Sequence, residues 1–391
     1  MNSRKLRGVA LTLFLAVGFA CTGPAGTPTS AQAAGVRPQV GKPLQAAIAL
    51  ANKGNSSAAL SEVRQAESVG GLTASEQQAI AQTREFIAAK TGNFSGGGGS
   101  ATAARAKFAA DYNAGRYNAV TGEDVELLRK YGAFGGDDQL IVAQAYYLSG
   151  RAAQAVSYLR ALTSGAHPSE AALKLMYSAA YKAADSDAMR AALERLVLDY
   201  NRPEYWANLL QIAEGAKGLK DHQTLDVFRL RLLTGTMKTP DDYTTAAEMA
   251  LEFGSAAEAS NIVQKGIDAK VLSGDRATKL LNTAKAQAAT DAANFPKTAA
   301  AAAKARTGDD AVRLGEELTG AGRAPDAINE MQQGIQKGVT DKGNAQISLG
   351  LAYLAAGQKD MAIRTFNAVP KEDTNNAMLA HLWAIYTHNT H

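Results

Sequence analysis

The chain has 391 residues, with 41 Lys and Arg against 37 Asp and Glu and a single cysteine. This length exceeds what one compact core usually holds, so we expect several domains or an array of repeats. A single cysteine excludes an internal disulfide, and no stretch beyond residue 33 is apolar and long enough to cross a bilayer.

The first 33 residues have the pattern of a signal peptide. Three basic residues come first, an apolar run follows over residues 9–20, and an A-x-A cleavage site stands at residues 31–33. The run is too short for a membrane span. We therefore expect export to the periplasm and a mature chain that begins at Ala34.

Cys21 leaves a second interpretation open, because a lipoprotein signal also places a cysteine just after its apolar run. Such signals normally carry Leu three residues before the cysteine and a small residue two before it. Gly18 and Phe19 occupy these positions here, which is a poor match. The alternative to a periplasmic protein is an outer-membrane lipoprotein anchored through Cys21.

The positive charge of the chain belongs mostly to the signal segment. Its removal takes away three basic residues and no acidic one, which leaves 38 basic residues (41 less these three) against 37 acidic ones. A nearly neutral mature chain argues against nucleic acid or an anionic membrane surface as the main partner.

The region before residue 136 predicts loosely patterned helices. Residues 34–91 predict helical hairpins after a loose lead-in over residues 36–40, and the spacing from Thr73 to Glu76 is that of a capping box that opens a helix. Residues 92–100 are a Gly/Ser-rich linker by composition. Residues 101–135 predict one further helical pair.

From residue 136 to residue 376 one pattern recurs. Its copies begin at residues 136, 170, 203, 240, 274, 308 and 343, so successive starts are 34, 33, 37, 34, 34 and 35 residues apart. The clearest copy, residues 344–369, predicts two helices joined by a turn at Gly357. A pair of this length cannot bury its apolar face alone, so neighbouring copies must stack on one another.

This pattern resembles the tetratricopeptide repeat family, whose period is about 34 residues. The matched positions are Leu349, Gly350, Tyr353, Gly357, Ala362 and Phe366. The resemblance implies an all-α fold, an α-solenoid of helix-turn-helix repeats. Two features depart from the family pattern: its frequent Trp appears only as Trp206, and Pro296 falls where the second helix of the unit at 274 is expected, which it should kink or shorten. The alternative is an alanine-rich helical bundle without true repetition.

Residues 377–386 predict a closing helix, because a solenoid needs a cap on its last unit. We expect Trp383 to pack within this cap. His388 and His391 are three residues apart and would share a face of a helix, as metal ligands can, but a solvated tail is the better explanation. No metal site and no cofactor are predicted.

The sequence carries no recognisable catalytic pattern. It lacks the H-E-x-x-H and G-x-S-x-G motifs, and the glycines at 96–99 lack the lysine and strand of a phosphate-binding loop. The acidic pairs at residues 137–138 and 241–242 open predicted helices, where capping explains them. We expect a protein that is not an enzyme.

Binding is the remaining function. The resemblance implies that the first helices of the repeats line a concave groove. Carrying this over unit by unit gives the candidate groove residues Gln144, Tyr147, Lys174, Ser178, Tyr181, Gln211, Glu214, Glu248, Glu252, Asn282 and Lys285. Tyrosines beside polar groups suit a protein or peptide partner, with a glycan as the alternative ligand.

The resemblance then implies a scaffold for envelope assembly, secretion or polysaccharide export. The alternatives are the helical domain of a glycan-acting protein and a lipid-anchored scaffold.

Overall fold

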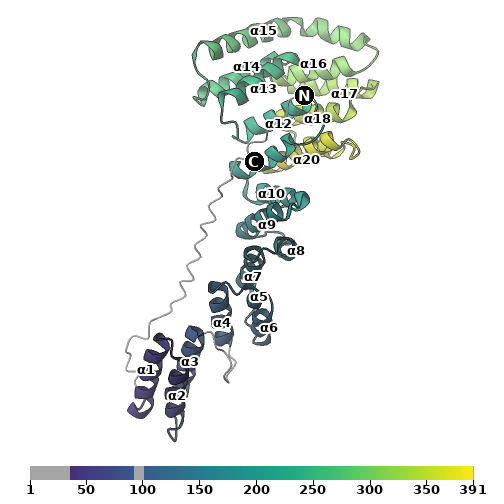
Figure 1. Ribbon diagram of the computed structural model, residues 1–391. Helices are drawn as coiled ribbons and strands as arrows, with labels where there is room; N and C mark the ends of the chain where they lie inside the picture. Colours follow the sequence, from purple (N-terminus) through teal and green to yellow (C-terminus); the bar gives the residue numbers. More distant parts are fainter. Residues whose placement is uncertain (1–35, 92–100, 391) are drawn as a thin grey trace, which may run out of the picture. The chain divides into compact units, whose positions relative to one another are not determined.

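The computed structural model describes residues 36–91 and 101–390, and within these ranges every regular element is a helix (Figure 1). The predicted signal peptide, Cys21, the Gly/Ser-rich linker and His391 lie outside the described residues. The described chain forms two compact units. Unit 1 comprises the residues up to 114 together with 126–133, and unit 2 comprises 115–125 and the residues from 134 onward.

Unit 1 is a small helical bundle. Its helices are α1 (Pro38–Asn52), α2 (Ser56–Glu67), α3 (Ala74–Thr91), α4 (Ala101–Asn113) and most of α6 (Glu123–Lys130). The first three helices pack against one another around a core that includes Val40 and Val63. The loose lead-in expected over residues 36–40 is therefore wrong in part, because α1 begins at Pro38 and Val40 is buried.

Glu76 ties the bundle together at the start of α3. Its carboxylate accepts a hydrogen bond from the Thr73 amide at 2.9 Å, and the Thr73 hydroxyl accepts one from the Glu76 amide, which confirms the predicted capping box. The same carboxylate accepts bonds from the amide and guanidinium of Arg37. These bonds, the Arg37 guanidinium first, lower the pKa of Glu76 to about 2.

Unit 2 holds the repeat array. Its helices are α5 (Tyr117–Val120), α7 (Gly136–Leu148), α8 (Ala152–Leu162), α9 (Glu170–Ala183), α10 (Ser186–Tyr200), α11 (Pro203–Glu214), α12 (Asp221–Leu233), α13 (Pro240–Glu252), α14 (Ala256–Asp268), α15 (Gly274–Lys304), α16 (Asp309–Gly320), α17 (Ala324–Lys337), α18 (Lys342–Ala355), α19 (Lys359–Asn367) and α20 (Thr374–Asn389). The predicted repeat starts at 136, 170, 203, 240, 274, 308 and 343 each fall within one residue of a helix start. The predicted period is thus confirmed.

Close packing between the two helices of a pair explains why the motif has a small residue at the position of Gly350. Gly350 of α18 faces Phe366 of α19, and a Cβ atom at Gly350 would lie 2.3 Å from the Phe366 ring. The turn between these helices passes through Gly357, whose φ of 74° is one that glycine adopts without strain. The aromatic ring therefore fills the space that the missing side chain leaves.

The unit expected at residue 274 departs from the pattern. Instead of a helix pair, the chain forms one continuous helix, α15, of 31 residues. No glycine interrupts residues 275–304, and alanine, the best helix former, dominates them. Pro296 does not shorten this helix, contrary to expectation. Both Pro296 and Ala292, whose carbonyl loses its partner, are exposed, so water can satisfy the freed group.

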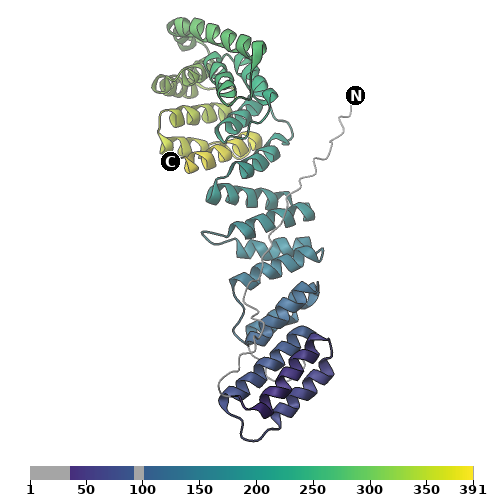
Figure 2. The ribbon, with the colours of Figure 1, turned by 90° about the vertical axis from the view of Figure 1, so that its left-hand side faces the viewer.

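The last helix returns to the middle of the array. In Figures 1 and 2 the yellow helix α20 lies beside the teal helices α10 and α12, and the contacts of α20 agree. Trp383 of α20 is 1% exposed and stacks against Phe366, which confirms its predicted role in the cap. The array is therefore closed on itself from α10 to α20.

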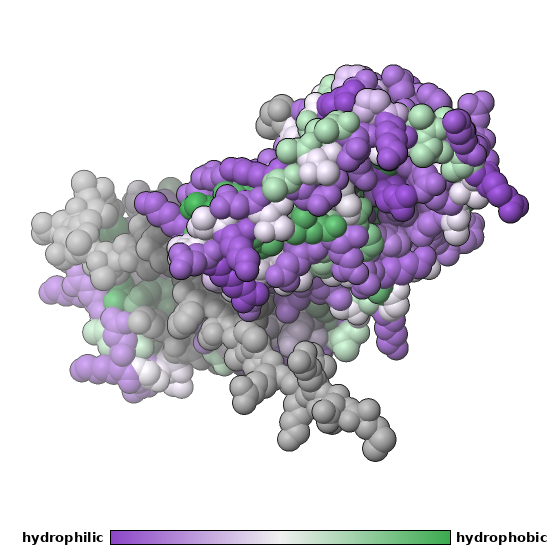
Figure 3. Space-filling view, turned by 90° about the horizontal axis from the view of Figure 1, so that it is seen from above, coloured by the Kyte–Doolittle hydropathy of each residue, from purple (hydrophilic) through white to green (hydrophobic). Residues whose placement is uncertain are grey.

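The face of the molecule at the α15 end is predominantly hydrophilic, with hydrophobic side chains gathered in a small area (Figure 3). The buried positions of α15 form a narrow stripe that includes Leu281 and Phe295, and most of its other side chains are exposed. None of the helices that the structure describes combines the length and the apolar character needed to cross a membrane.

Candidate functional site

Five of the predicted groove residues lie on two neighbouring helices. Gln144 and Tyr147 belong to α7, and Lys174, Ser178 and Tyr181 belong to α9. The two helices contact each other as the first helices of successive pairs. We call these five residues, together with Leu148 and Lys182, the open-run face; the Lys182 side chain of α9 reaches Tyr147 of α7.

The open-run face presents aromatic and apolar groups to solvent. Tyr181 is 71% exposed and Leu148 is 48% exposed, the two highest values among the large apolar side chains of the described residues. The Lys182 ammonium lies 5.0 Å from the centre of the Tyr147 ring, within range of a cation–π contact. The Ser178 hydroxyl, by contrast, donates to the Lys174 carbonyl of its own helix.

The other six predicted groove residues are exposed and spread over three helices. They are Gln211 and Glu214 on α11, Glu248 and Glu252 on α13, and Asn282 and Lys285 on α15. Glu214 pairs with Arg231 at 3.0 Å, and Glu248 lies 3.7 Å from Arg276. Nothing in the structure joins these six into a single site.

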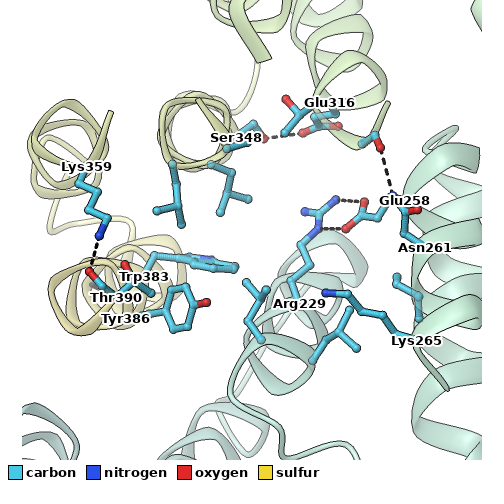
Figure 4. Close-up of a pocket in the computed structure, with 18 of the residues that line it drawn as sticks. Arg229, Glu258, Asn261, Lys265, Glu316, Ser348, Lys359, Trp383, Tyr386 and Thr390 are labelled. Carbon is cyan, nitrogen blue, oxygen red and sulfur yellow. Dashed lines mark hydrogen bonds and ion pairs between the residues drawn. The ribbon is translucent and has the colours of Figure 1, made fainter. Parts of the chain in front are cut away.

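A chamber of about 600 Å³ lies elsewhere in unit 2 (Figure 4). Five helices line most of it, in the order α12, α14, α16, α18 and α20, and single residues of α17 and α19 complete the wall. Arg229 of α12 is hydrogen-bonded to Glu258 of α14, and α20 contacts α12 again. We call these five helices the ring. None of the predicted groove residues lines the chamber.

Polar contacts close the ring between α12 and α20. The Gln223 amide donates to the Asn376 side chain at 2.9 Å, across 153 residues of sequence. Asn376, which is fully buried, donates in turn to Asp341 and Asp373. Between α14 and α16, Gly320 packs so closely that a Cβ atom there would lie 3.1 Å from the Glu258 backbone.

Arg229 is the central charge in the chamber wall. Its guanidinium donates two hydrogen bonds to Glu258, at 2.6 and 2.7 Å, and a third to Asp226 at 2.8 Å. Nearby, Glu316 accepts a hydrogen bond from the Ser348 hydroxyl. Three carboxylates thus surround one cation.

Burial shifts the pKa values of the charged groups in this cluster. Burial raises the pKa of Asp226 and of Glu316, and Arg229 opposes the shift in both. Arg229 itself stays protonated: burial acts to lower its pKa, but the Glu258 carboxylate raises it well above the usual value. The adjacent Glu317 has a pKa raised to about 7, first by burial and then by Asp291.

The predicted roles of the acidic pairs as caps are confirmed for their second members. Asp138 accepts a hydrogen bond from the Gly135 amide at 2.8 Å. Asp242 accepts from the Lys238 and Thr239 amides, each at 2.9 Å. Both carboxylates therefore satisfy free amides at helix starts.

Comparison with known proteins concerns the fold alone. No protein-family model matches the chain, and no curated protein matches it. Among solved structures, the chain is similar to the Cut9–Hcn1 hetero-tetramer of the APC/C, at 10% identity over 80% of this chain and 69% of that chain, with a TM-score of 0.23. It is also similar to the TPR domain of P58(IPK), at 14% identity over 89% of this chain and 97% of that chain, with a TM-score of 0.22.

Unit 2 is an array of tetratricopeptide-like helix pairs in which the single helix α15 replaces one pair. TM-scores this low do not describe a shared superposition, so this assignment rests on the helix pairs themselves and their recurrence every 33 to 37 residues.

Sequence reasoning missed the chamber because α15 replaces a pair by one helix. Before α15, the second helices of the pairs, α12 and α14, face the chamber; after it, the first helices, α16 and α18, do so. A prediction restricted to first helices cannot find such a site. One signal was present: Asp226 and Arg229 stand three residues apart among the apolar residues of α12, which also carries Arg231.

Proposed function

We propose that this chain is an exported, non-enzymatic scaffold that binds a protein partner through the open-run face. The observation that carries the proposal is the exposure of Tyr181 and Leu148 on neighbouring helices. Tyrosine is enriched at protein interfaces, where its ring supplies contact area and its hydroxyl a hydrogen bond. The Tyr147 ring, capped by Lys182, extends the same face.

The location and pathway are part of this proposal. The basic start, apolar run and A-x-A site within residues 1–33 support export to the periplasm, with anchoring through Cys21 as the alternative. Envelope assembly, secretion and polysaccharide export are the processes in which such a scaffold would act. Mass spectrometry of the purified native protein separates the two locations, because a free Ala34 amine supports the periplasm and an acylated Cys21 supports the anchor.

A non-enzymatic role is supported by the absence of catalytic motifs in the sequence. The charged cluster of Arg229, Glu258 and Glu316 in the chamber wall also has structural partners: Arg229 joins α12 to α14, and Ser348 joins α18 to α16. Such pairing explains them as links between helices.

An affinity experiment with envelope extract tests the proposal. The bait is the chain from residue 34 onward, compared with a Tyr147→Ala/Tyr181→Ala variant. Met361→Ala is the matched control, because Met361 is an exposed apolar side chain on α19, away from the open-run face. We expect a protein that the unaltered chain and the control retain and that the double variant loses, with the helical circular dichroism unchanged. A protein retained by all three baits would exclude the open-run face as the interface.

A further inference from the structure

The polar contacts that close the ring surround one histidine, His222, the second residue of α12. We infer that His222 acts as a pH-sensitive latch: at acid pH its protonation weakens the contact of α12 with the starts of α18 and α20 and loosens the ring at this point. The latch lies apart from the open-run face, so the inference does not depend on the proposed scaffold function.

Three helix starts meet at the latch. Lys220, at the start of α12, donates to Asp341, the N-cap of α18, at 3.0 Å. Asn376, buried in the first turn of α20, accepts a hydrogen bond from Gln223 of α12. Asn376 also donates to Asp341 and to Asp373, the N-cap of α20. A new charge at this junction therefore acts on the contacts that close the ring.

His222 lies within this junction with one ring nitrogen confined. Its Nε2 atom is buried and has no hydrogen-bond partner among the described residues. The Oδ2 atom of Asp341 is 3.7 Å away, beyond hydrogen-bond distance. That carboxylate is already engaged, because Oδ2 accepts from Lys220 and Oδ1 accepts from the Asn344 amide and the Asn376 side chain. A proton on Nε2 would have to compete with Lys220 for Oδ2.

The two protonation states of His222 therefore fit this position differently. A neutral imidazole can carry its single proton on Nδ1 and leave Nε2 bare, whereas a protonated imidazole carries an N–H on both nitrogens. The second N–H would be buried near the Lys220 ammonium without an acceptor of its own. A buried donor without an acceptor is unfavourable, so the closed ring favours neutral His222.

The charges around His222 do not reverse this preference. Burial is the first cause that lowers the pKa of His222, and Lys220 also acts to lower it. Three carboxylates act to raise it, one on or beside each of the three helices: Asp226, Asp341 and Asp373. The result is a pKa below the ordinary value of a histidine. An opened latch exposes the imidazole to water and binds the proton more tightly, so closure weakens as the pH falls below about 6.5.

Amide hydrogen exchange at pH 7.5 and pH 5.5, corrected for the intrinsic exchange rates, tests the latch. The quantity to compare is the ratio of opening in α20 at pH 5.5 to that at pH 7.5, in the unaltered chain and in His222→Gln. Glu316 and Glu317 are present in both chains, so this comparison isolates His222. We expect a ratio up to about tenfold larger in the unaltered chain, because a group with an ordinary pKa gains protons by that factor one pH unit below it.

His381→Gln is the matched control. His381 is also on α20, but its side chain is 52% exposed and lies 3.3 Å from Glu194 of α10. This variant should keep the pH response of the unaltered chain. A direct NMR titration of the unaltered chain gives a second measurement that requires no variant, and the imidazole of His222 should titrate below pH 6.5.

Four results would overturn the inference. An equal pH ratio in the unaltered chain and His222→Gln would remove His222 as the sensor, and loss of the response in His381→Gln alone would assign it to the contact between α10 and α20. A response of equal size in α7 to α9 would indicate global unfolding. Titration of His222 at or above pH 6.5 would mean that its protonated form takes Asp341 from Lys220 and tightens the ring.

Discussion

The open run of unit 2, helices α7 to α9, and the ring are built from the same repeat but hold together differently. In the open run, each helix packs mainly on helices next to it in sequence. In the ring, side chains more than 100 residues apart in sequence are joined, such as Gln223 with Asn376 and Lys220 with Asp341. One repeat can therefore give an open stack with an exposed face or a closed chamber.

The difference arises at α15. In a regular array the same helix of each pair faces inward throughout. Here one long helix stands in place of a pair, so the second helices of the pairs face the chamber before α15 and the first helices face it after α15. The exchange lets α16 approach α14 directly, with Gly320 against the Glu258 backbone. Closure of the ring is then completed by α20 against α12. The closure of the ring therefore follows from a single irregular repeat unit, the one formed by α15.

The largest expected effect comes from removing the cation of the ring. Arg229→Met leaves Asp226, Glu258 and Glu316 without their guanidinium, and breaking a buried ion pair in this way lowers the free energy of unfolding by about 3–5 kcal/mol. Because burial raises the pKa of Asp226 and Glu316, their protonation should reduce the loss at pH 5 compared with pH 8. Urea denaturation at both pH values measures the change.

Hydrogen exchange then distinguishes the two regions. Amides of α12, α14 and α16 should lose protection in Arg229→Met, and amides of α7 to α9 should keep theirs. Arg313→Met is the control, since Arg313 is exposed and pairs only with Asp310 three residues away, an arrangement that contributes less than about 1 kcal/mol. Equal losses for the two variants would show that the Arg229 cluster does not hold the ring.

The next largest effect concerns closure itself. Asn376→Ala removes three side-chain hydrogen bonds, to Gln223, Asp341 and Asp373, and leaves the buried Gln223 amide unpaired. We expect a loss of about 2–3 kcal/mol and faster exchange along α20. Asn375→Ala is the neighbouring control, because Asn375 makes one bond, to the Lys217 carbonyl. Unchanged exchange in α20 would mean that apolar packing alone closes the ring.

A smaller effect tests how closely the helices of a pair pack in the ring and in the open run. The repeat position that Gly350 occupies in α18 is occupied by Ala143 in α7. Gly350→Ala drives a Cβ atom into the buried Phe366 ring and should destabilise the chain by about 1–3 kcal/mol in thermal or urea unfolding. Gly136→Ala, which meets open space, should change stability by less than about 0.5 kcal/mol. Similar losses in both would remove close packing as the reason for Gly350.

The sequence predicted these local features well because they depend on residues close together in the chain. Gly357 at the turn, Gly350 against Phe366 and the cap at Thr73 are each decided within about 20 residues. The chamber depends instead on α15, where alanine-rich sequence without a glycine extends one helix through the expected turn. Pairings such as Gln223 with Asn376 carry no local signal, so neither the closure nor the exchange of inner helices could be read from the repeat.

The two regions also differ in how their stability depends on pH. In the open run and the pair beside it, Asp185 has a pKa lowered by the Ala188 amide and by Arg160, so its stabilising effect is present at pH 4 and above and is lost only in stronger acid. In the ring, Glu317 has its pKa raised to about 7 by burial and Asp291. The folded chain then holds this proton more tightly than the unfolded chain, so stability falls as the pH rises from about 4.5 to 7.

Glu317→Gln, the smallest expected effect, uses this difference. At pH 8 the variant lacks the half-buried charge that opposes folding, so its Tm should exceed that of the unaltered chain by about 1–3 °C. At pH 4.5 the unaltered chain carries a proton on Glu317, so the two Tm values should nearly coincide. Glu252→Gln, at an exposed carboxylate of α13, should leave the Tm unchanged at both pH values. A gain of equal size at pH 4.5 and pH 8 would trace the effect to packing of the amide, and the titration of Glu317 would then not distinguish the ring from the open run.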